Sequence, residues 1–208
     1  MSQYFSIHPE TPQPRLIHQA TEIIRSGGVA TYPTDTGYAI GCNLGDKQAV
    51  DRIRQIRRLD DKHHFTLLCK DLSDLGTYAR VGNSVFRQLK AHTPGPFTFI
   101  LEATSEVPRR LQSGKKKTIG LRVPSNPIAL AILEELDEPL MSTTLQLPDD
   151  DYALTDPRDI RDFLERRVDL IIDGGYGGLE LTSVIDLTED IPILVRQGAG
   201  AFDDFVPR

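Results

Sequence analysis

Residues 29–42 read VATYPTDTGYAIGC, and the other segments of the chain can be arranged around them. The apolar, β-branched run 29–32 closes at Pro33, and polar residues follow at 34–37, which predicts a buried strand that delivers a tight turn. Two hydroxyls and a carboxylate on such a turn suit the binding of a small polar ligand, because loops on a rigid scaffold carry most binding groups. Pro, Thr, Asp and Gly also favour turns for local reasons, so a plain turn is the alternative.

Helix and strand patterns alternate on both sides of this segment. Apolar residues at helical spacing before Gly27 and after Asp46 predict two helices, and Asn126 and Asp156, each followed by proline, predict two later helix starts. We expect helices at 16–26, 47–58, 71–79, 83–92, 127–136 and 157–167. We expect strands at 29–33, 38–42, 65–69, 97–101, 118–123, 139–142, 170–172, 184–187 and 191–195. This order predicts a single α/β domain, a twisted open sheet flanked by helices.

Length and composition limit the class of protein. A chain of 208 residues suffices for one buried core, and 39% hydrophobic with 26% charged residues is typical of a soluble globular protein. No apolar stretch approaches the roughly 20 residues that span a bilayer, and no basic leader is visible, so we expect no membrane contact and a cytoplasmic location. Cys42 and Cys69 lie in apolar runs, which favours buried reduced thiols over one disulfide.

Several familiar catalytic templates are absent from the sequence. It has no P-loop, no Gly-x-Gly-x-x-Gly after a strand and no Gly-x-Ser-x-Gly elbow. No cluster of His and Cys has zinc-ligand spacing, so no metal site is predicted. His63 and His64 are adjacent and would point to opposite faces of a strand, and we expect a structural or surface role for both.

The net charge of −6 conceals a separation of charge along the chain. Basic residues gather on one face of the expected second helix and in one loop, namely Arg52, Arg54, Arg57, Arg58 and 115–117. Much of the acid lies at 134–162 and 186–204. The basic face could bind phosphates. A solvated helix end whose cations complement the helix dipole is the simpler interpretation of charge alone.

Six further motifs follow residues 33–42 in order, at 94–98 (PGPFT), 122–127 (RVPSNP), 142–144 (STT), 173–175 (DGG), 182–184 (TSV) and 196–198 (RQG). With these motifs the chain resembles the YrdC-like family, the threonylcarbamoyl-AMP synthases and their relatives. The resemblance implies a mixed sheet with a broad concave cleft. It also implies a YrdC-like domain at 14–200, with terminal extensions at 1–13 and 201–208.

The same resemblance implies an activity. Such synthases convert L-threonine, bicarbonate and ATP into threonylcarbamoyl-AMP and pyrophosphate, the first step of a tRNA modification. Mg²⁺ would arrive with the ATP, and no tightly bound cofactor is predicted. Carried over to this chain, the catalytic residues are Arg58, Lys62 and Thr144. The substrate-binding residues are Thr34, Thr36, Ser142 and Gln146, and the nucleotide-binding residues are Arg122, Thr182, Ser183 and Arg196.

The chain departs from the motif of the synthases in two places. They carry Lys-x-Arg where this chain has 56–58, so an apolar Ile56 replaces an ammonium unless Arg57 supplies the contact. They carry Ser-x-Asn where this chain has Thr144 and Gln146, and the added bulk could retune a site that needs sub-ångström placement. We therefore expect a weak or diverged synthase.

Two rival hypotheses stay open. The basic cleft could bind double-stranded RNA or tRNA without chemistry, through Arg52, Arg54 and Arg57, with an affinity that falls steeply with salt. Alternatively, the cleft could serve a different nucleotide or an acyl phosphate.

Overall fold

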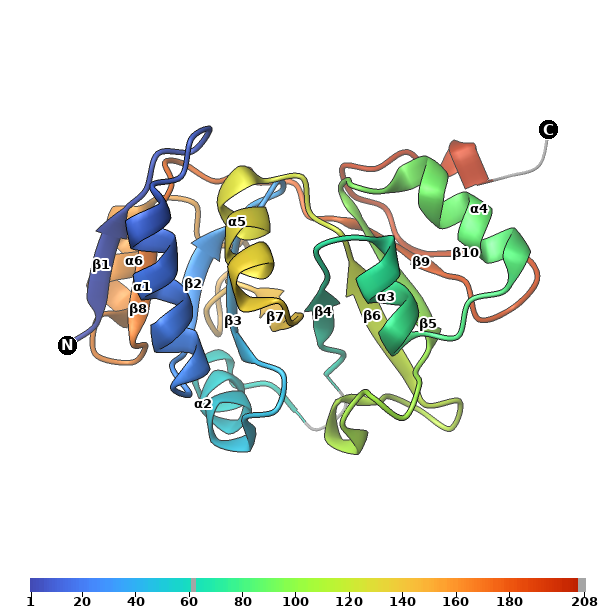
Figure 1. The fold of residues 1–208 in the computed structure, drawn as a ribbon, viewed down its shortest axis with the longest axis horizontal. Helices are drawn as coiled ribbons and strands as arrows, with labels where there is room; N and C mark the ends of the chain where they lie inside the picture. Colours follow the sequence, from blue (N-terminus) through green and yellow to red (C-terminus); the bar gives the residue numbers. More distant parts are fainter. Residues whose placement is uncertain (61–62, 206–208) are drawn as a thin grey trace.

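The computed structural model describes residues 1–60 and 63–205 (Figure 1). Its helices are α1 (Pro14–Arg25), α2 (Lys47–Arg57), α3 (Leu72–Tyr78), α4 (Asn83–His92), α5 (Pro127–Leu136) and α6 (Pro157–Leu164). Its strands are β1 (Gln3–Ser6), β2 (Ala30–Pro33), β3 (Tyr38–Asn43), β4 (Thr66–Leu68), β5 (Phe97–Glu102), β6 (Thr118–Arg122), β7 (Leu140–Thr144), β8 (Leu170–Asp173), β9 (Ser183–Asp186) and β10 (Ile193–Arg196). Short 3₁₀ helices lie at Arg109–Leu111 and Phe202–Phe205.

The strands of the described residues form one sheet in the order β1-β8-β2-β3-β7-β4-β6-β5-β9-β10. The pairs β1–β8, β2–β8, β4–β6 and β5–β9 are parallel, and the other neighbours are antiparallel. Figure 1 shows helices on both sides of this sheet. The predicted α/β class, a single-domain mixed sheet flanked by helices, is therefore confirmed.

We call β1, β8, β2, β3 and β7 the first half of the sheet, and β4, β6, β5, β9 and β10 the second half. The segment at 29–42 forms a hairpin in the first half. β2 is buried along its whole length and pairs antiparallel with β3, with Pro33 opposite Tyr38. The turn between them is closed at Thr34, whose backbone N–H and hydroxyl both donate to the carbonyl of Gly37, at 2.8 and 2.6 Å. The predicted buried strand and tight turn are both confirmed.

The helices cover the first half of the sheet from both faces. α1 and α5 pack on each other and on one face, where their apolar residues share a core cluster with Ala39 and Ile172. α2 and α6 pack on β3 and β8 from the other face, whose core includes Ile40 and Ile171. Neighbouring strand residues thus enter opposite layers, as the period of two requires.

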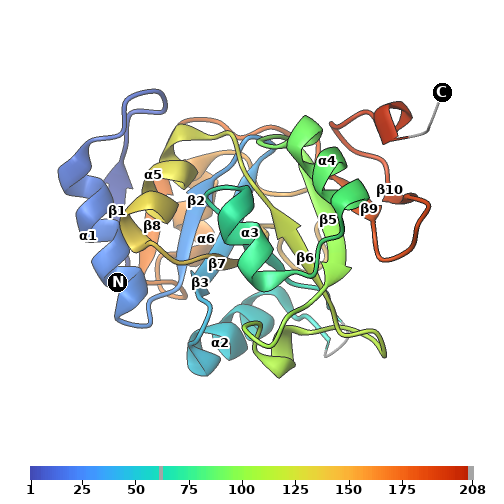
Figure 2. The same cartoon turned by 45° about the vertical axis from the view of Figure 1, so that its right-hand side comes forward.

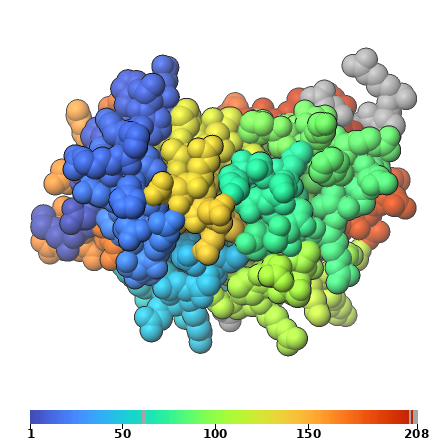
Figure 3. Space-filling view, in the orientation of Figure 1, coloured from blue at the N-terminus to red at the C-terminus, as the bar shows by residue number. Residues whose placement is uncertain are grey.

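The second half of the sheet is covered by α3 and α4, which lie over β6 and β5 (Figures 1 and 2). Leu75 of α3 and Leu89 of α4 join the core cluster that contains Phe99 and Leu121. In Figure 3 the helices α1, α5, α3 and α4 form a continuous layer across this face of the molecule. The alternate residues of β4, β5, β6 and β9 point away from that layer and line a cleft, namely Thr66, Leu68, Thr98, Ile100, Gly120, Arg122 and Val184.

Local sequence signals account for most helix starts. The side chains of Asp46, Asn126 and Asp156 accept hydrogen bonds from the first amides of α2, α5 and α6, as their cap positions predict. α6 ends at Leu164, earlier than the predicted 167, because the amide of Arg167 turns back to the Leu164 carbonyl. β1, within the segment expected as a terminal extension, pairs in parallel with β8.

Cys42 and Cys69 are buried free thiols, as predicted. Burial raises the pKa of the Cys42 thiol to about 12, so it stays protonated and unreactive at neutral pH. Among the described residues, none of the helices is both long enough and apolar enough to cross a bilayer.

Candidate functional site

A cleft of about 420 Å³ runs over the strands from β3 to β10. Its lining comes from the turn after β2, the end of α2, the residues before β4 and the exposed face of the second half of the sheet. Of the residues assigned from the resemblance, the cleft brings together Thr34, Thr36, Arg122, Ser142, Thr144, Gln146, Thr182 and Arg196. Residues that are far apart in the sequence therefore share one solvent-accessible site.

Arg122, at the end of β6, is a buried cation of the cleft wall. Its guanidinium donates to the Asp35 carboxylate and, at 3.2 Å, to the Thr36 hydroxyl. Burial lowers the pKa of Arg122, and the Asp35 charge opposes that shift. The Thr34 and Thr36 hydroxyls lie 3.3 Å apart beside it. This arrangement offers a positive charge and two hydroxyls to a small polar ligand.

One polar atom of each partner in this pair is left unsatisfied. Arg122 Nε and Asp35 Oδ2 are buried and have no hydrogen-bond partner in the structure. A buried unsatisfied donor or acceptor costs about 1–3 kcal/mol. Folds keep such costs mainly at functional sites, which supports a functional role for this turn. Asp35 was not assigned to the site from the sequence, although it lies in the turn at 34–37 that was expected to bind a small polar ligand.

Arg196 forms the second cationic point of the cleft. Its guanidinium donates to the Thr182 carbonyl at 2.9 and 3.2 Å and to the Thr182 hydroxyl at 3.1 Å. That hydroxyl lies 2.9 Å from the hydroxyl of Thr98. Ser183, by contrast, faces the core: its hydroxyl donates to the Gly200 carbonyl at 2.5 Å and the residue is fully buried. The strand alternation that brings Thr182 into the cleft therefore turns Ser183 away from it.

Arg57, at the end of α2, lines the cleft. Its guanidinium donates to the backbone carbonyl of Gln146, and its Nε is buried without a partner. Burial lowers the pKa of Arg57. From the sequence, Arg57 was predicted to bind RNA together with Arg52 and Arg54, whereas in the structure it lines the cleft.

The neighbours of Arg57 do not line the cleft. Ile56 is buried in the core and does not line the cleft, so among residues 56–58 the cation at the cleft is Arg57. Arg58 ends the helix in a left-handed conformation, and its largely exposed side chain pairs with Asp149 at 3.1 Å. Successive helical residues are rotated by about 100°, which separates these three side chains. Lys62, the other predicted catalytic cation, lies outside the described residues.

Two histidines that were expected to have a structural or surface role lie along the cleft. His63 Nε2 is 3.0 Å from the Thr143 hydroxyl, and the ring meets Phe65 edge-on at 5.2 Å between centroids. Burial, followed by the nearby Arg57 charge, lowers the pKa of His63 to about 4, so the ring is neutral at pH 7. His64 also lines the cleft and is exposed. Their position directly before β4 was the available signal, because strand ends deliver side chains to a site.

β7 and the residues after it complete the lining of the cleft on the β3 side of β4. Ser142 accepts a hydrogen bond from the Tyr32 hydroxyl at 2.9 Å. Thr144 and Gln146 line the cleft as predicted, and the Gln146 amide donates to the Asp150 carbonyl at 2.7 Å. The side-chain amide of this glutamine therefore contacts the backbone of Asp150, in the segment after β7.

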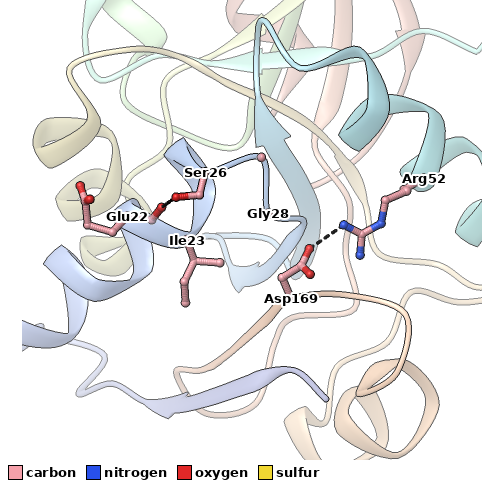
Figure 4. Close-up of a pocket in the computed structure, with 7 residues that line it drawn as sticks. Glu22, Ile23, Ser26, Gly28, Arg52 and Asp169 are labelled. Carbon is pink, nitrogen blue, oxygen red and sulfur yellow. Dashed lines mark hydrogen bonds and ion pairs between the residues drawn. The ribbon is translucent and has the colours of Figure 1, made fainter.

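The three arginines proposed for RNA contact do not share one surface. Arg52 pairs with Asp169 at 2.7 Å across a separate hollow of about 500 Å³ at the end of α1 (Figure 4). Arg54 lies over the Phe65 ring, 4.9 Å from its centroid. Arg57 lines the cleft. The predicted basic face of α2 is thus divided among three different environments.

Comparison with known proteins relates the chain to one family and its structures. The family model described as telomere recombination, which covers Sua5, YciO and YrdC proteins, matches residues 22–198. The chain is 58% identical to YciO of Escherichia coli (strain K12), an uncharacterized protein, over 99% of this chain and 100% of the relative. The crystal structure of E. coli YciO superposes with a TM-score of 0.95 over 99% of this chain and 100% of that chain.

More distant relatives carry a named activity. The threonylcarbamoyl-AMP synthase of Halorhodospira halophila (strain DSM 244 / SL1) is 30% identical over 83% of this chain and 89% of the relative. The crystal structure of P. abyssi Sua5 complexed with L-threonine has a TM-score of 0.87 and 27% identity. That match covers 95% of this chain but only 58% of the Sua5 chain. These similarities confirm the resemblance that the ordered motifs indicated.

Proposed function

This chain belongs to the Sua5, YciO and YrdC family, and on that premise we propose that its cleft binds L-threonine and an adenine nucleotide as a diverged threonylcarbamoyl-AMP synthase. The proposed reaction joins L-threonine, bicarbonate and ATP into threonylcarbamoyl-AMP and releases pyrophosphate. The observation that carries the proposal is the buried Arg122, held by Asp35 beside the hydroxyls of Thr34 and Thr36 in one cleft.

The amino acid would lie at the turn after β2. Thr34 and Thr36 offer hydroxyls there, and Arg122 offers a cation to a carboxylate. Gly178 brings the 174–182 loop against this turn, since a side chain at that position would meet the Thr36 carbonyl at 2.6 Å. The likeness to a Sua5 structure complexed with L-threonine supports this placement.

The nucleotide would occupy the side of the cleft nearer β9 and β10. Arg196 and Thr182 offer donors to phosphate oxygens, and at the end of α2 Arg57 takes the role that the resemblance implied for Arg58. Ile100 and Val184, both on the cleft face, form an apolar wall suited to a base. Mg²⁺ would arrive with the nucleotide, and the described residues hold no group of three or more His, Cys, Asp or Glu that could bind a metal.

In the proposed chemistry, the amine of L-threonine adds to bicarbonate with loss of water, which gives N-carboxythreonine. A carbamate oxygen of N-carboxythreonine then attacks the α-phosphorus of ATP, and the bond to the leaving pyrophosphate breaks. Negative charge then builds on the α-phosphoryl oxygens. Arg57 and Arg196 would stabilise that charge without reorganisation, because hydrogen bonds already hold both guanidinium groups in place. Ser142 and Thr144 would orient the reacting groups from β7.

Pyrophosphate release tests the proposal directly. Purified protein with ATP, L-threonine and bicarbonate is expected to release pyrophosphate slowly, and omission of threonine is expected to stop it. Arg122→Ala is expected to reduce the rate by at least about tenfold, the effect of losing a charge-assisted contact. Arg58→Ala is the matched control, because that side chain pairs with Asp149 outside the cleft. Threonine-independent release, or equal losses in both variants, would remove the basis of the proposal.

A further inference from the structure

Two of the ordered motifs, at 182–184 and 196–198, come together at the edge of the sheet, where β9 and β10 pair antiparallel. Ser183 is fully buried there. Its hydroxyl accepts a hydrogen bond from the backbone N–H of Gly198 at 2.9 Å and donates to the carbonyl of Gly200 at 2.5 Å. One buried hydroxyl thus holds two points of the segment that follows β10.

That segment, residues 197–200, lies directly against the backbone just before β9. The N–H of Ala199 donates to the Leu181 carbonyl at 2.9 Å. A side chain at Gly198 would clash with the same carbonyl, and glycine permits the close approach because it has no Cβ. The segment is therefore held against β9 by its own backbone and by the Ser183 hydroxyl.

β10 is irregular just where it carries its arginine. Leu194 pairs with Ile185 and Arg196 with Val184, so Val195 is an extra residue in the strand. A bulge of this kind bends the strand, redirects a side chain and is common beside active sites. Val195 and Arg196 both line the cleft, although neighbours in a regular strand face opposite layers. The direction of the arginine therefore depends on how the backbone after it is held.

From these contacts we infer that Ser183 is a positioning residue of the nucleotide site, which acts through Arg196. The inference rests on the proposed function, which assigns this arginine to the phosphates of the nucleotide. Nε and Nη2 of the guanidinium donate to Thr182, and this orientation presents Nη1 to a ligand. Ser183 maintains the orientation before the nucleotide arrives, so that less conformational freedom is lost on binding.

Titration calorimetry with ATP and with AMP tests this role. We expect Ser183→Ala to weaken the binding of both nucleotides by about threefold to tenfold, and Arg196→Ala by about tenfold or more. In the Arg196→Ala background, Ser183→Ala should cause no further loss, because a residue that acts through the arginine has no effect without it. L-threonine affinity should stay unchanged in Ser183→Ala, since the amino acid would lie at the turn after β2.

A second variant loosens the same segment without altering a buried position. The exposed Gln197 donates to the Gly200 carbonyl at 2.8 Å, and we expect Gln197→Ala to weaken nucleotide binding in the same direction as Ser183→Ala. Thr21→Val is the matched control, because it removes another fully buried hydroxyl, which donates to the His18 carbonyl within α1. Nucleotide affinity should be the same in this control as in the wild type.

The outcomes separate the inference from the proposed function. Unchanged nucleotide affinity in Ser183→Ala, or the same loss with and without the Arg196 side chain, would overturn the inference and leave the proposed nucleotide site intact. An equal loss of L-threonine and nucleotide affinity would also overturn it, because that result indicates a general structural role. Absence of ATP and AMP binding by the wild type would overturn both.

Discussion

Arg122 donates to Asp35 from the end of β6, and the two side chains, 8% and 12% exposed, form a buried ion pair in the wall of the cleft. The turn at 34–37 and the exposed face of the second half of the sheet are joined at this contact. The ion pair therefore connects the turn after β2 to the end of β6, and both of these segments line the cleft.

Asp35→Asn should destabilise the protein. The variant leaves the Arg122 cation without its counter-charge, and loss of one partner from a buried pair costs about 3–5 kcal/mol. We expect the lower end of that range, because an amide oxygen can still accept the hydrogen bond. Urea denaturation measures the change in the free energy of unfolding. Asp149→Asn, which breaks the exposed pair with Arg58, is the control and should leave stability unchanged.

Arg57 and Arg58 should differ in nucleotide binding although they are adjacent. Arg57→Ala removes a cation from the cleft wall and should weaken AMP binding by about 1.5–3 kcal/mol. Arg58→Ala should leave AMP binding unchanged, because its partner is the exposed Asp149. Isothermal titration of both variants gives the comparison. Equal losses would mean that the end of α2 rearranges when ligand binds.

Ile56→Lys should not restore a phosphate contact. The residue is 4% exposed and packs in the core, so the new ammonium would be buried without a partner. We expect the free energy of unfolding to fall by about 4 kcal/mol or more, the size typical of buried unpaired charge. Arg57→Lys is the control and should fold normally. A stable Ile56→Lys variant with stronger ATP binding would show that the side chain can reach the cleft.

The fold was largely accessible from the sequence because its signals are local. Asp46 and Asn126 cap helices through amides within three residues of themselves, and the apolar runs mark the strands. β1 was missed because its four residues carry a weak pattern, and parallel pairing with the distant β8 determines its conformation. Pairing between strands that are far apart in the sequence cannot be recognised from a short stretch of residues.

The site was only partly accessible from the sequence. Motif spacing assigned Arg58 to the ligand, whereas the helical rotation of α2 presents Arg57, one residue earlier. Ser183 was assigned to the nucleotide together with Thr182 from the resemblance, whereas neighbouring residues of an extended segment face opposite layers and its hydroxyl donates to the Gly200 carbonyl. His63 was set aside, because its place in the cleft depends on Thr143, a contact across 80 residues.

RNA binding through α2 should be weak. Arg52 is paired with Asp169, and Arg54 lies over Phe65, so RNA phosphates would compete with existing contacts. We expect Arg52→Ala to change duplex RNA or tRNA affinity by less than about twofold and to leave its salt dependence unaltered. Filter binding across a salt series measures both quantities, with the Asp169→Ala variant as the control that frees Arg52. A flatter salt slope in Arg52→Ala would support the RNA-binding hypothesis.

His63 should make stability depend on pH. Burial and the Arg57 charge lower its pKa from 6.5 to about 4, so the unfolded chain takes up the proton at a higher pH than the folded protein. Between about pH 6.5 and 4 the unfolded state binds more protons, and the free energy of unfolding falls as the pH falls through that window. We expect a loss of about 1–2 kcal/mol, less than the full pKa difference implies, because the ring is only half-buried.

His63→Gln should remove this part of the pH dependence of stability, whereas His18→Gln, on the exposed side of α1, should keep it. Urea denaturation at several pH values measures the difference, which should vanish above pH 7. Parallel curves for the wild type and His63→Gln would mean that the folded protein accepts the proton on His63 without penalty.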